Sequence, residues 1–246
     1  EVIRDNNGIN HIYANNQKDL FFIQGYLAAK DRLFQFEVWR RQATGTVSEI
    51  LGPGELKRDI GTRLFKFRGN IKDESDHYHD DGYKIINSYV EGVNAYIDEV
   101  NKYPGKLPIE FSLLGIKPKL WTPEVVISRH QGLLGNIDQE LSIGRAVSRI
   151  GEKRVKDLMW FHPKEPSLKL HDKIRKEHLD KDILGLYNAY RRPINFKQEH
   201  IVEEYRIVEE YKKETKNKIS FYDNIDKRDE FSIGSNNWAI SGSKSA

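Results

Sequence analysis

The segment from Lys18 to Ala43 constrains the fold of this chain more than any other stretch. Its spacing is helical, and apolar residues occur on nearly every face of the expected helix: Leu20, Ile23, Leu27, Leu33, Phe34, Val38 and Trp39. A helix on the surface of a domain keeps one side polar, whereas a helix this apolar is mostly buried. We therefore expect other layers of structure around it, and we expect it to end at Gly45.

The composition limits the class of protein. The chain has 246 residues, enough for one large domain or two small ones. Its 40 basic and 37 acidic residues give a net charge of +3, which does not indicate a nucleic-acid partner. The absence of cysteine excludes disulfides, a thiol nucleophile and thiolate metal sites. No run of about 18 apolar residues occurs, so we expect no membrane span.

The rest of the chain is predicted to be mainly helical, with a few short strands. Two short strands are expected within residues 2–14, because Asn-Gly between alternating apolar runs favours a hairpin. Apolar residues spaced by three and four predict a helix over 83–103. Further helices are expected at about residues 123–134, 138–150 and 151–161. The connector 108–122 is expected to be irregular, with Trp121 anchored in the core.

Charged residues interrupt the apolar helices in two places. Asp31, Arg32, Arg40 and Arg41 lie on the long apolar helix and are expected to form structural ion pairs. Residues 197–230 are much more charged, with 8 Lys or Arg and 10 Asp or Glu. The apolar stripe Ile201, Tyr205 and Val208 follows Asn195, a residue that favours helix N-caps. We expect a solvated, weakly docked helix there, followed by a linker.

The last residues, 231–246, change character again. Ile233 to Ile240 predicts a strand, and Ser241-Gly242-Ser243 predicts a turn. One strand with one turn does not stand in water without partners. We therefore expect a sheet whose other strands lie mostly beyond Ala246.

Four blocks of sequence resemble the penicillin acylase (penicillin amidase) family of N-terminal-nucleophile hydrolases. They are IRDNNGINHIYANN, QGYLAAKDRLFQFEVWRRQATGTVSEILG, LLGIKPKLWTPEVV and GSNNWAISGSKSA, in the order that the family has them. The resemblance covers residues 2 to about 165 and 231–246, and four blocks at matching separations are more specific than a single motif. It implies an α+β protein with a four-layered αββα fold when complete, of which the part present is mainly helical.

The family is made as one precursor, so the resemblance implies a division of this chain into three parts. Residues 1–170 correspond to the helical α-subunit portion, residues 171–234 to the end of the α chain and a charged spacer, and residues 235–246 to the start of the β subunit. The partner of the α portion would be its own β subunit after processing. The family also suggests export to the periplasm or the medium. We expect the 246-residue chain alone to be inactive, because the family's oxyanion hole would lie after it.

The resemblance implies that Ser235 is the nucleophile and the first residue of the mature β chain. A serine hydroxyl is a poor nucleophile until a base takes its proton. Once the chain is cut before Ser235, its own α-amino group, with an ordinary pKa of about 7.7–8.0, can serve as that base. Gly234 suits the cutting step, because a residue without Cβ can adopt a strained backbone. We expect the Asn236 amide to hold the serine or the scissile peptide by hydrogen bonds.

Two other interpretations of this stretch are open. Gly-Ser is also an ordinary linker dipeptide, and the dipeptide alone would favour that interpretation. Ser241 to Lys244 matches the Ser-x-x-Lys motif of serine β-lactamases. No Lys-Thr-Gly follows it, however, and Gly242 suits a turn between strands better than the opening of a helix.

The stretch GNIDQELS, residues 135–142, holds the expected metal ligand. In the family a glutamate of this stretch helps to bind calcium, and Glu140 occupies the matching position. Calcium takes about six to eight oxygen ligands, so the β part would supply the others. The alternative is that Asp138 and Glu140 only complement the N-terminus of the following helix. No organic cofactor is expected.

The expected acyl pocket lies just before this glutamate. The family's α part lines the pocket at the positions of Leu133, Leu134, Asn136 and Ile137. Apolar side chains there would accept an aromatic or alkyl acyl group from a small-molecule N-acyl substrate. Ordinary helix packing is the alternative for each of these residues.

The resemblance as a whole implies an amidohydrolase that cleaves the linear amide of an N-acylated substrate, such as a penicillin side chain, through an acyl-enzyme on Ser235. Acyl-homoserine lactone acylase and glutaryl or cephalosporin acylase are alternative activities of the same class. A helical binding module without catalysis is the alternative outside that class. The α part alone does not distinguish among the acylases.

Overall fold

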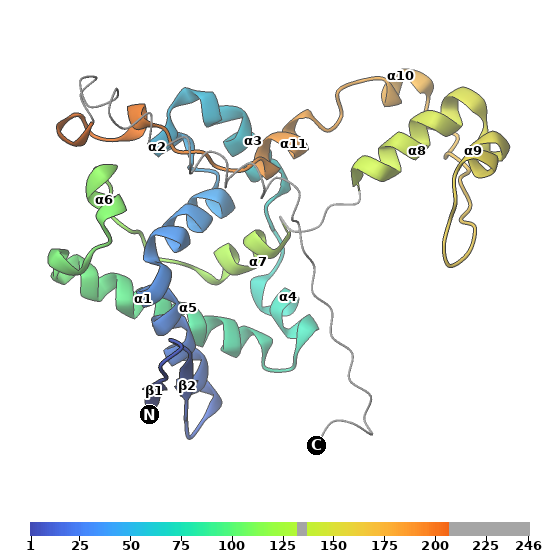
Figure 1. The fold of residues 1–246 in the computed structure, drawn as a ribbon. Coiled ribbons are helices and arrows are strands. Elements are labelled where there is room, and N and C mark those ends of the chain that lie inside the picture. Colours follow the sequence, from blue (N-terminus) through green and yellow to red (C-terminus); the bar gives the residue numbers. More distant parts are fainter. Residues whose placement is uncertain (132–136, 207–246) are drawn as a thin grey trace. The chain divides into compact units, whose positions relative to one another are not determined.

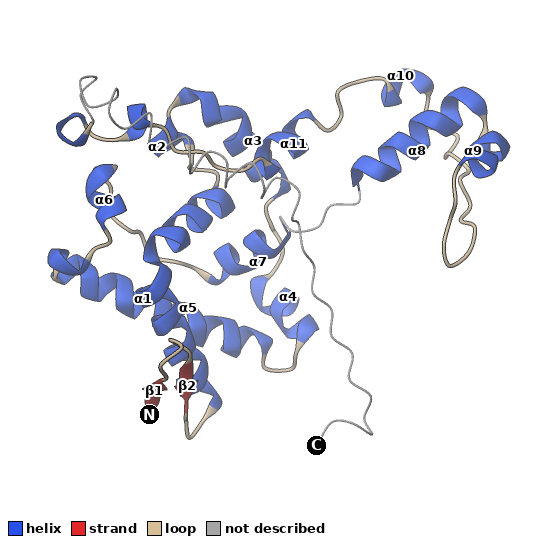
Figure 2. Ribbon diagram, in the orientation of Figure 1, coloured by secondary structure: helices blue, strands red, loops and turns tan. Residues whose placement is uncertain are grey.

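The computed structural model describes residues 1–131 and 137–206. These residues form helices and one two-stranded sheet (Figure 2). The chain divides into two compact units, one from Glu1 to His200 and one from Ile201 onward. The mainly helical character expected from the sequence is confirmed. None of the helices in the described ranges is both long and apolar enough to cross a membrane.

The chain begins with the expected hairpin. The strand β1, Val2–Arg4, pairs antiparallel with β2, Asn10–Ile12, and Ile3 lies opposite His11. The turn between them requires Gly8, which takes a φ of 80°, a conformation that residues with side chains rarely adopt.

The long apolar helix is α1, Gln17–Thr44, with bounds that agree with the prediction. The side chain of Asn16 caps its first turn by accepting a backbone N–H, and Gly45 ends it in the left-handed conformation at a φ of 65°. Non-helical angles at Arg32, φ −143° and ψ 38°, divide the helix into two segments. Its buried residues all lie beyond the first two turns, which are less covered than the sequence predicts.

The second long helix, α5, Gly82–Lys102, packs against α1 at a very close approach (Figure 1). A Cβ atom on Gly25 of α1 would overlap the carbonyl oxygen of Tyr89, and one on Gly92 of α5 would overlap that of Phe22. The two glycines therefore permit a contact that larger residues would prevent. Side chains of both helices form the core around it: Ala29, Leu33, Phe36, Val90, Val93, Tyr96, Ile97 and Val100.

A polar contact spans the same pair of helices. The Tyr26 hydroxyl donates a hydrogen bond to the Glu99 carboxylate, which also accepts from Lys106 at 2.6 Å. The hydrogen bond to Glu99 raises the pKa of Tyr26 to about 12. The hydrogen bond from Lys106, and then that from Tyr26, lowers the pKa of Glu99. Tyr26 is therefore neutral and Glu99 charged at neutral pH, which keeps the bond intact.

Short helices connect α1 to α5. They are α2, Ser48–Leu51; the 3-10 helix η1, Pro53–Glu55; α3, Leu56–Phe65; and α4, Ile71–Tyr78. Neither α3 nor α4 is predicted from the sequence, because both are shorter than the windows in which helical periodicity stands out. A local signal exists at Asn70, whose side chain caps α4 by accepting two backbone N–H groups.

The predicted connector after α5 is partly helical. The 3-10 helix η2, Pro104–Lys106, comes before residues 108–122, α6, Ile109–Leu113, lies within them, and α7, Pro123–Gln131, follows. The expectation of an irregular connector is therefore wrong for α6. Trp121 is 6% exposed, as predicted, and its backbone exchanges hydrogen bonds of 2.8 and 2.9 Å with the Asn94 side chain.

The following helices are α8, Ile137–Ile150, and α9, Glu152–Leu158, which confirm the helices predicted there. Two further short helices were not expected: α10, Lys176–Leu179, and α11, Gly185–Arg191.

The helix predicted after Asn195 does not form in the described residues. Through residue 206 the chain instead makes two single 3-10 turns, η3, Gln198–His200, and η4, Glu203–Tyr205. A charged helix with one apolar stripe is marginal without tertiary contacts, because nucleating it fixes several residues for one hydrogen bond. The later part of that prediction, and the strand expected at 233–240, lie outside the described residues.

We predict that Gly92→Ala lowers the free energy of unfolding by about 1–3 kcal/mol, because the added methyl group forces the α1 and α5 backbones apart. Gly105→Ala is the matched control, since a Cβ there meets no atom within 4 Å, and it should change stability by less than about 0.5 kcal/mol. Chemical denaturation measures both variants. Equal stability of the two would contradict the close approach.

Candidate functional site

Most residues predicted for the active site lie outside the described part of the chain. Gly234, Ser235 and Asn236 fall beyond residue 206. Leu133, Leu134 and Asn136 fall within residues 132–136. These six assignments stay predictions. Two of the predicted residues, Ile137 and Glu140, are described.

Ile137 and Glu140 lie three positions apart at the start of α8 and therefore on one face of the helix. Both are exposed, Ile137 at 39%. Asp138 and Glu140 bring negative charge to the helix N-terminus, where the helix dipole favours it. None of the side chains of α8 is buried, although the helix is amphipathic. The helix that carries both predicted residues is thus only partly covered by the described chain.

A calcium site at Glu140 would need further ligands. Within residues 1–131 and 137–206, no three His, Asp or Glu side chains lie close enough together to hold a metal ion. Calcium takes about six to eight oxygen ligands, of which one carboxylate supplies at most two. The described His, Asp and Glu side chains therefore do not form such a site by themselves.

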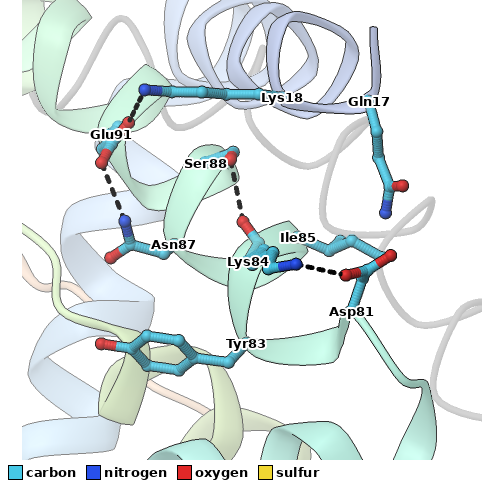
Figure 3. Close-up of a pocket in the computed structure, with 9 residues that line it drawn as sticks. All are labelled: Gln17, Lys18, Asp81, Tyr83, Lys84, Ile85, Asn87, Ser88 and Glu91. Carbon is cyan, nitrogen blue, oxygen red and sulfur yellow. Dashed lines mark hydrogen bonds and ion pairs between the residues drawn. The ribbon is translucent and has the colours of Figure 1, made fainter.

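A polar cleft of about 390 Å³ lies between the start of α1 and the first half of α5 (Figure 3). Lys84 Nζ lies 2.8 Å from the Asp81 carboxylate, and Lys18 Nζ lies 3.8 Å from that of Glu91. The Asn87 amide also donates to Glu91, at 2.8 Å. The charged groups that line the cleft are therefore paired with one another.

The chemistry of this cleft does not suit amide hydrolysis. The Ser88 hydroxyl donates to the backbone carbonyl of Lys84 at 2.8 Å, which commits it to its own helix. The hydrogen bond from Lys84 lowers the pKa of Asp81, and that carboxylate raises the pKa of Lys84. Both groups are therefore charged at neutral pH, and neither is poised to transfer a proton. The cleft therefore does not pair a serine with a base.

A buried ion cluster lies on α1. Glu37, 2% exposed, accepts hydrogen bonds of 2.7 and 2.9 Å from Arg40 and lies 2.8 Å from Arg41 Nε. The backbone N–H of Lys119 donates to the same carboxylate at 3.1 Å. Arg41 reaches onward to Glu49 at 2.8 Å. Burial raises the pKa of Glu49, but the hydrogen bond from Arg41 and the charge of Lys119 outweigh this effect and hold that pKa below its ordinary value.

These contacts confirm the structural ion pairs predicted for Arg40 and Arg41. Asp31 also pairs as predicted, with Arg4 at 2.9 Å. The prediction is wrong for Arg32, whose guanidinium lies exposed at the break in α1 and hydrogen-bonds Gln35 at 3.4 Å. An exposed guanidinium remains hydrated and needs no ion pair.

Two buried carboxylates were missed by the sequence analysis. Glu37 lies three and four residues before Arg40 and Arg41, the spacing at which side chains on a helix meet, so that pattern was an available signal. Asp59, 4% exposed, accepts the backbone N–H of Ser48 at 2.8 Å and so fixes the start of α2. Asp59 and Ser48 are 11 residues apart, across a turn, so the sequence gives no comparable signal for this contact.

Comparison with known proteins places these features in context. A family model described as Penicillin amidase matches residues 1–246. Penicillin G acylase of Escherichia coli is 38% identical over 137 residues, 55% of this chain and 16% of that protein. Penicillin acylase 2 proenzyme of Pseudomonas sp. (strain SE83) is 30% identical over 191 residues, 76% of this chain and 24% of that protein. Acyl-homoserine lactone acylase QuiP of Pseudomonas aeruginosa is 28% identical over 176 residues, 68% of this chain and 20% of that protein.

The chain therefore spans about a quarter or less of these relatives. A solved structure of thermostable penicillin G acylase from Alcaligenes faecalis matches with a TM-score of 0.54 and 27% identity, over 70% of this chain and 96% of the solved chain. This likeness confirms the fold class expected from the sequence. Because a similar share of this chain, 76%, matches only 24% of the proenzyme, the solved chain is several times shorter than that proenzyme.

We predict that Glu37→Ala destabilises the protein by about 3–5 kcal/mol, because it leaves two buried guanidinium groups without their shared carboxylate. Glu91→Ala is the control. It removes an exposed carboxylate whose pair with Lys18 spans 3.8 Å, and it should cost less than about 1 kcal/mol. Unfolding of the two variants is measured side by side. If Glu37→Ala were as stable as Glu91→Ala, the buried cluster would not hold α1 in the core.

Proposed function

Because the chain belongs to the penicillin amidase family, we propose that the protein is an amidohydrolase that cleaves the linear amide of an N-acylated small molecule. The match of the family model over residues 1–246, which include GSNNWAISG around Ser235, is the observation that carries the proposal. The chain spans about a quarter or less of its curated relatives, so the activity would belong to a longer protein. We expect residues 1–246 alone to be inactive.

Ser235 is the proposed nucleophile. Its hydroxyl attacks the carbonyl carbon of the amide, and its own α-amino group accepts the proton, directly or through one water. The tetrahedral oxyanion needs aligned donors, which we assign to parts of the protein beyond this chain. The amine leaves with the proton, an acyl-enzyme remains on Ser235, and water then releases the acid. Asn236 is proposed to position the serine by hydrogen bonds.

The same hydroxyl is proposed to cut the precursor between Gly234 and Ser235. Attack on the Gly234 carbonyl carbon forms an ester with the serine oxygen and breaks the Gly234–Ser235 amide bond, which frees the amino group that later acts as base. Hydrolysis of that ester by one water then restores the Ser235 hydroxyl and leaves a carboxylate on Gly234. Two findings support processing of this kind. One relative is itself named a proenzyme. The solved acylase chain is several times shorter than that proenzyme and is matched over 96% of its length.

The substrate class is proposed from the predicted acyl pocket. Leu133, Leu134, Asn136 and Ile137 would present a mostly apolar surface to an aromatic or alkyl acyl group. The exposure of Ile137, 39%, leaves its side chain available for such a contact. Acyl-homoserine lactone acylase activity is the second candidate, because QuiP acylases are among the relatives. A panel of aryl, long-alkyl and dicarboxyl amides separates these activities.

Calcium is the proposed structural metal, with Glu140 as one ligand. The exposed position of Glu140 on the partly covered helix α8 supports this role, since its carboxylate can face another part of the protein. The other ligands would come from the β part.

We predict that Ser235→Ala in the full-length protein abolishes both the cut before residue 235 and amide hydrolysis. The loss of hydrolysis should be at least about a thousandfold, because one hydroxyl serves both steps. Ser241→Ala is the matched control, and it also tests the alternative Ser-x-x-Lys motif. Chain masses and amidase rates are the measurements. A Ser235→Ala protein that hydrolysed amides, or a Ser241→Ala protein that did not, would sink the assignment.

We predict that Glu140→Ala lowers the calcium content of the full-length protein and slows its maturation, while Ser235 remains able to react. Glu124→Ala is the matched control, because Glu124 is an exposed acidic residue in the first turn of the neighbouring helix α7. Calcium is measured by elemental analysis after dialysis. Equal calcium in the two variants would leave Glu140 with the helix-terminus role alone.

A further inference from the structure

The helix α11 lies within residues 171–234, the part that the resemblance assigns to the α-chain end and the spacer. It nevertheless packs against α3 (Figure 1). A Cβ atom on Gly61 of α3 would overlap the carbonyl oxygen of Leu186, so the two backbones touch. On the same helix Tyr187 and Ala189 are only 3% and 4% exposed. This degree of burial is typical of a domain core and not of a removable segment.

Arg58 of α3 also holds the chain just beyond the end of α11. Its guanidinium is part of a residue only 4% exposed, and it donates to the backbone carbonyls of Tyr190 at 3.4 Å, of Arg192, and of Pro193 at 3.0 Å. It also pairs with Glu55. Removing the three carbonyls would take most of the acceptors from a buried cation, which is unfavourable.

Aromatic rings also join α11 and the residues after it to α3 and α1. The ring of Phe65 on α3 lies 5.7 Å from that of Tyr187 and 5.4 Å from that of Tyr190, measured between centroids. Further along, the ring of Phe196 lies 5.4 Å from Phe34 of α1. The anchored stretch therefore reaches Phe196.

A separate set of contacts holds the chain just before α11. Arg145 of α8 donates to the backbone carbonyls of Leu179 at 2.7 Å and of Lys181 at 3.0 Å. Arg149 of α8 pairs with Asp180 at 3.1 Å. Leu179 is 8% exposed. The α10 segment is thus bound to α8 through its backbone, its charge and its apolar side chain.

From these contacts we infer that residues 176–196 are a permanent part of the α chain, and that any spacer is excised only from the residues after Phe196. The inference rests on the proposed function, because it concerns the second of the two cuts that release a spacer. That cut is a peptide hydrolysis: it consumes one water and leaves a carboxylate on the α chain and an amino group on the spacer. The excised spacer is thereby confined to the part of residues 171–234 that follows Phe196.

The first test is the intact mass of both chains after maturation of the full-length protein. We expect a β chain that begins at Ser235 and an α chain that ends at or beyond Phe196. A correct β chain beside an α chain that ends before Phe196 would overturn the inference and leave the proposed function standing. If no chain began at Ser235, the proposed function would fail. The second test would then decide whether residues 176–196 are held in the α chain.

The second test is limited digestion of the full-length protein with trypsin. We expect the bond after Arg191 to be cut at least about tenfold more slowly than the bond after Lys173, an exposed residue in a turn. Gly61→Ala should speed the cut after Arg191 about tenfold. The control Gly54→Ala, where a Cβ meets no atom within 4 Å, should not. Equal rates of cutting after Arg191 and after Lys173 in the parent protein would overturn the inference, whatever the two variants show.

Discussion

The described part of the chain depends on the contact between α1 and α5 at Gly25 and Gly92. Because the two backbones touch there, the flanking side chains reach across the interface, and Leu33, Val93 and Ile97 are each no more than 1% exposed. The contact of α3 with α11 at Gly61 is of the same kind. Glycine within a helix costs about 1 kcal/mol of helix stability, so its use at these points is offset by the packing that it permits.

Both long helices could be predicted from the sequence, α5 from apolar residues spaced by three and four and α1 from a long, densely apolar stretch that ends at Gly45. The contact that joins them could not. A glycine inside a helix is a weak signal, and the backbone that Gly25 meets, at Tyr89, lies far along the chain. The short helices α3 and α11 were missed because both are shorter than the windows in which helical periodicity stands out. Contacts such as those of Arg58 with backbone carbonyls stabilise them, and such contacts leave no pattern in the sequence.

The candidate site could be predicted from its own residues only in part. The residue types alone identify Gly234-Ser235 only as an ordinary dipeptide. The hypothesis that Ser235 is a nucleophile comes from the four blocks that resemble the family. The position of Glu140 on the first turn of α8 agrees with the sequence analysis. The metal role proposed for Glu140 comes from the resemblance, because one carboxylate supplies only part of the about six to eight oxygen ligands that calcium takes. The buried charges of α1 were predictable as ion pairs, because unpaired charges in a core are too costly to retain.

Ser235 is proposed to become an N-terminal residue and then to act as the nucleophile. The most direct measurement is covalent labelling of the matured full-length enzyme with a sulfonyl fluoride, which reacts with activated serine hydroxyls, followed by mass spectrometry of its peptides. The account predicts one adduct, on the hydroxyl of a Ser235 that carries a free amino group, formed in proportion to the loss of amidase activity. An adduct on Ser241 or another serine, or labelling of a Ser235 still joined to Gly234, would contradict it.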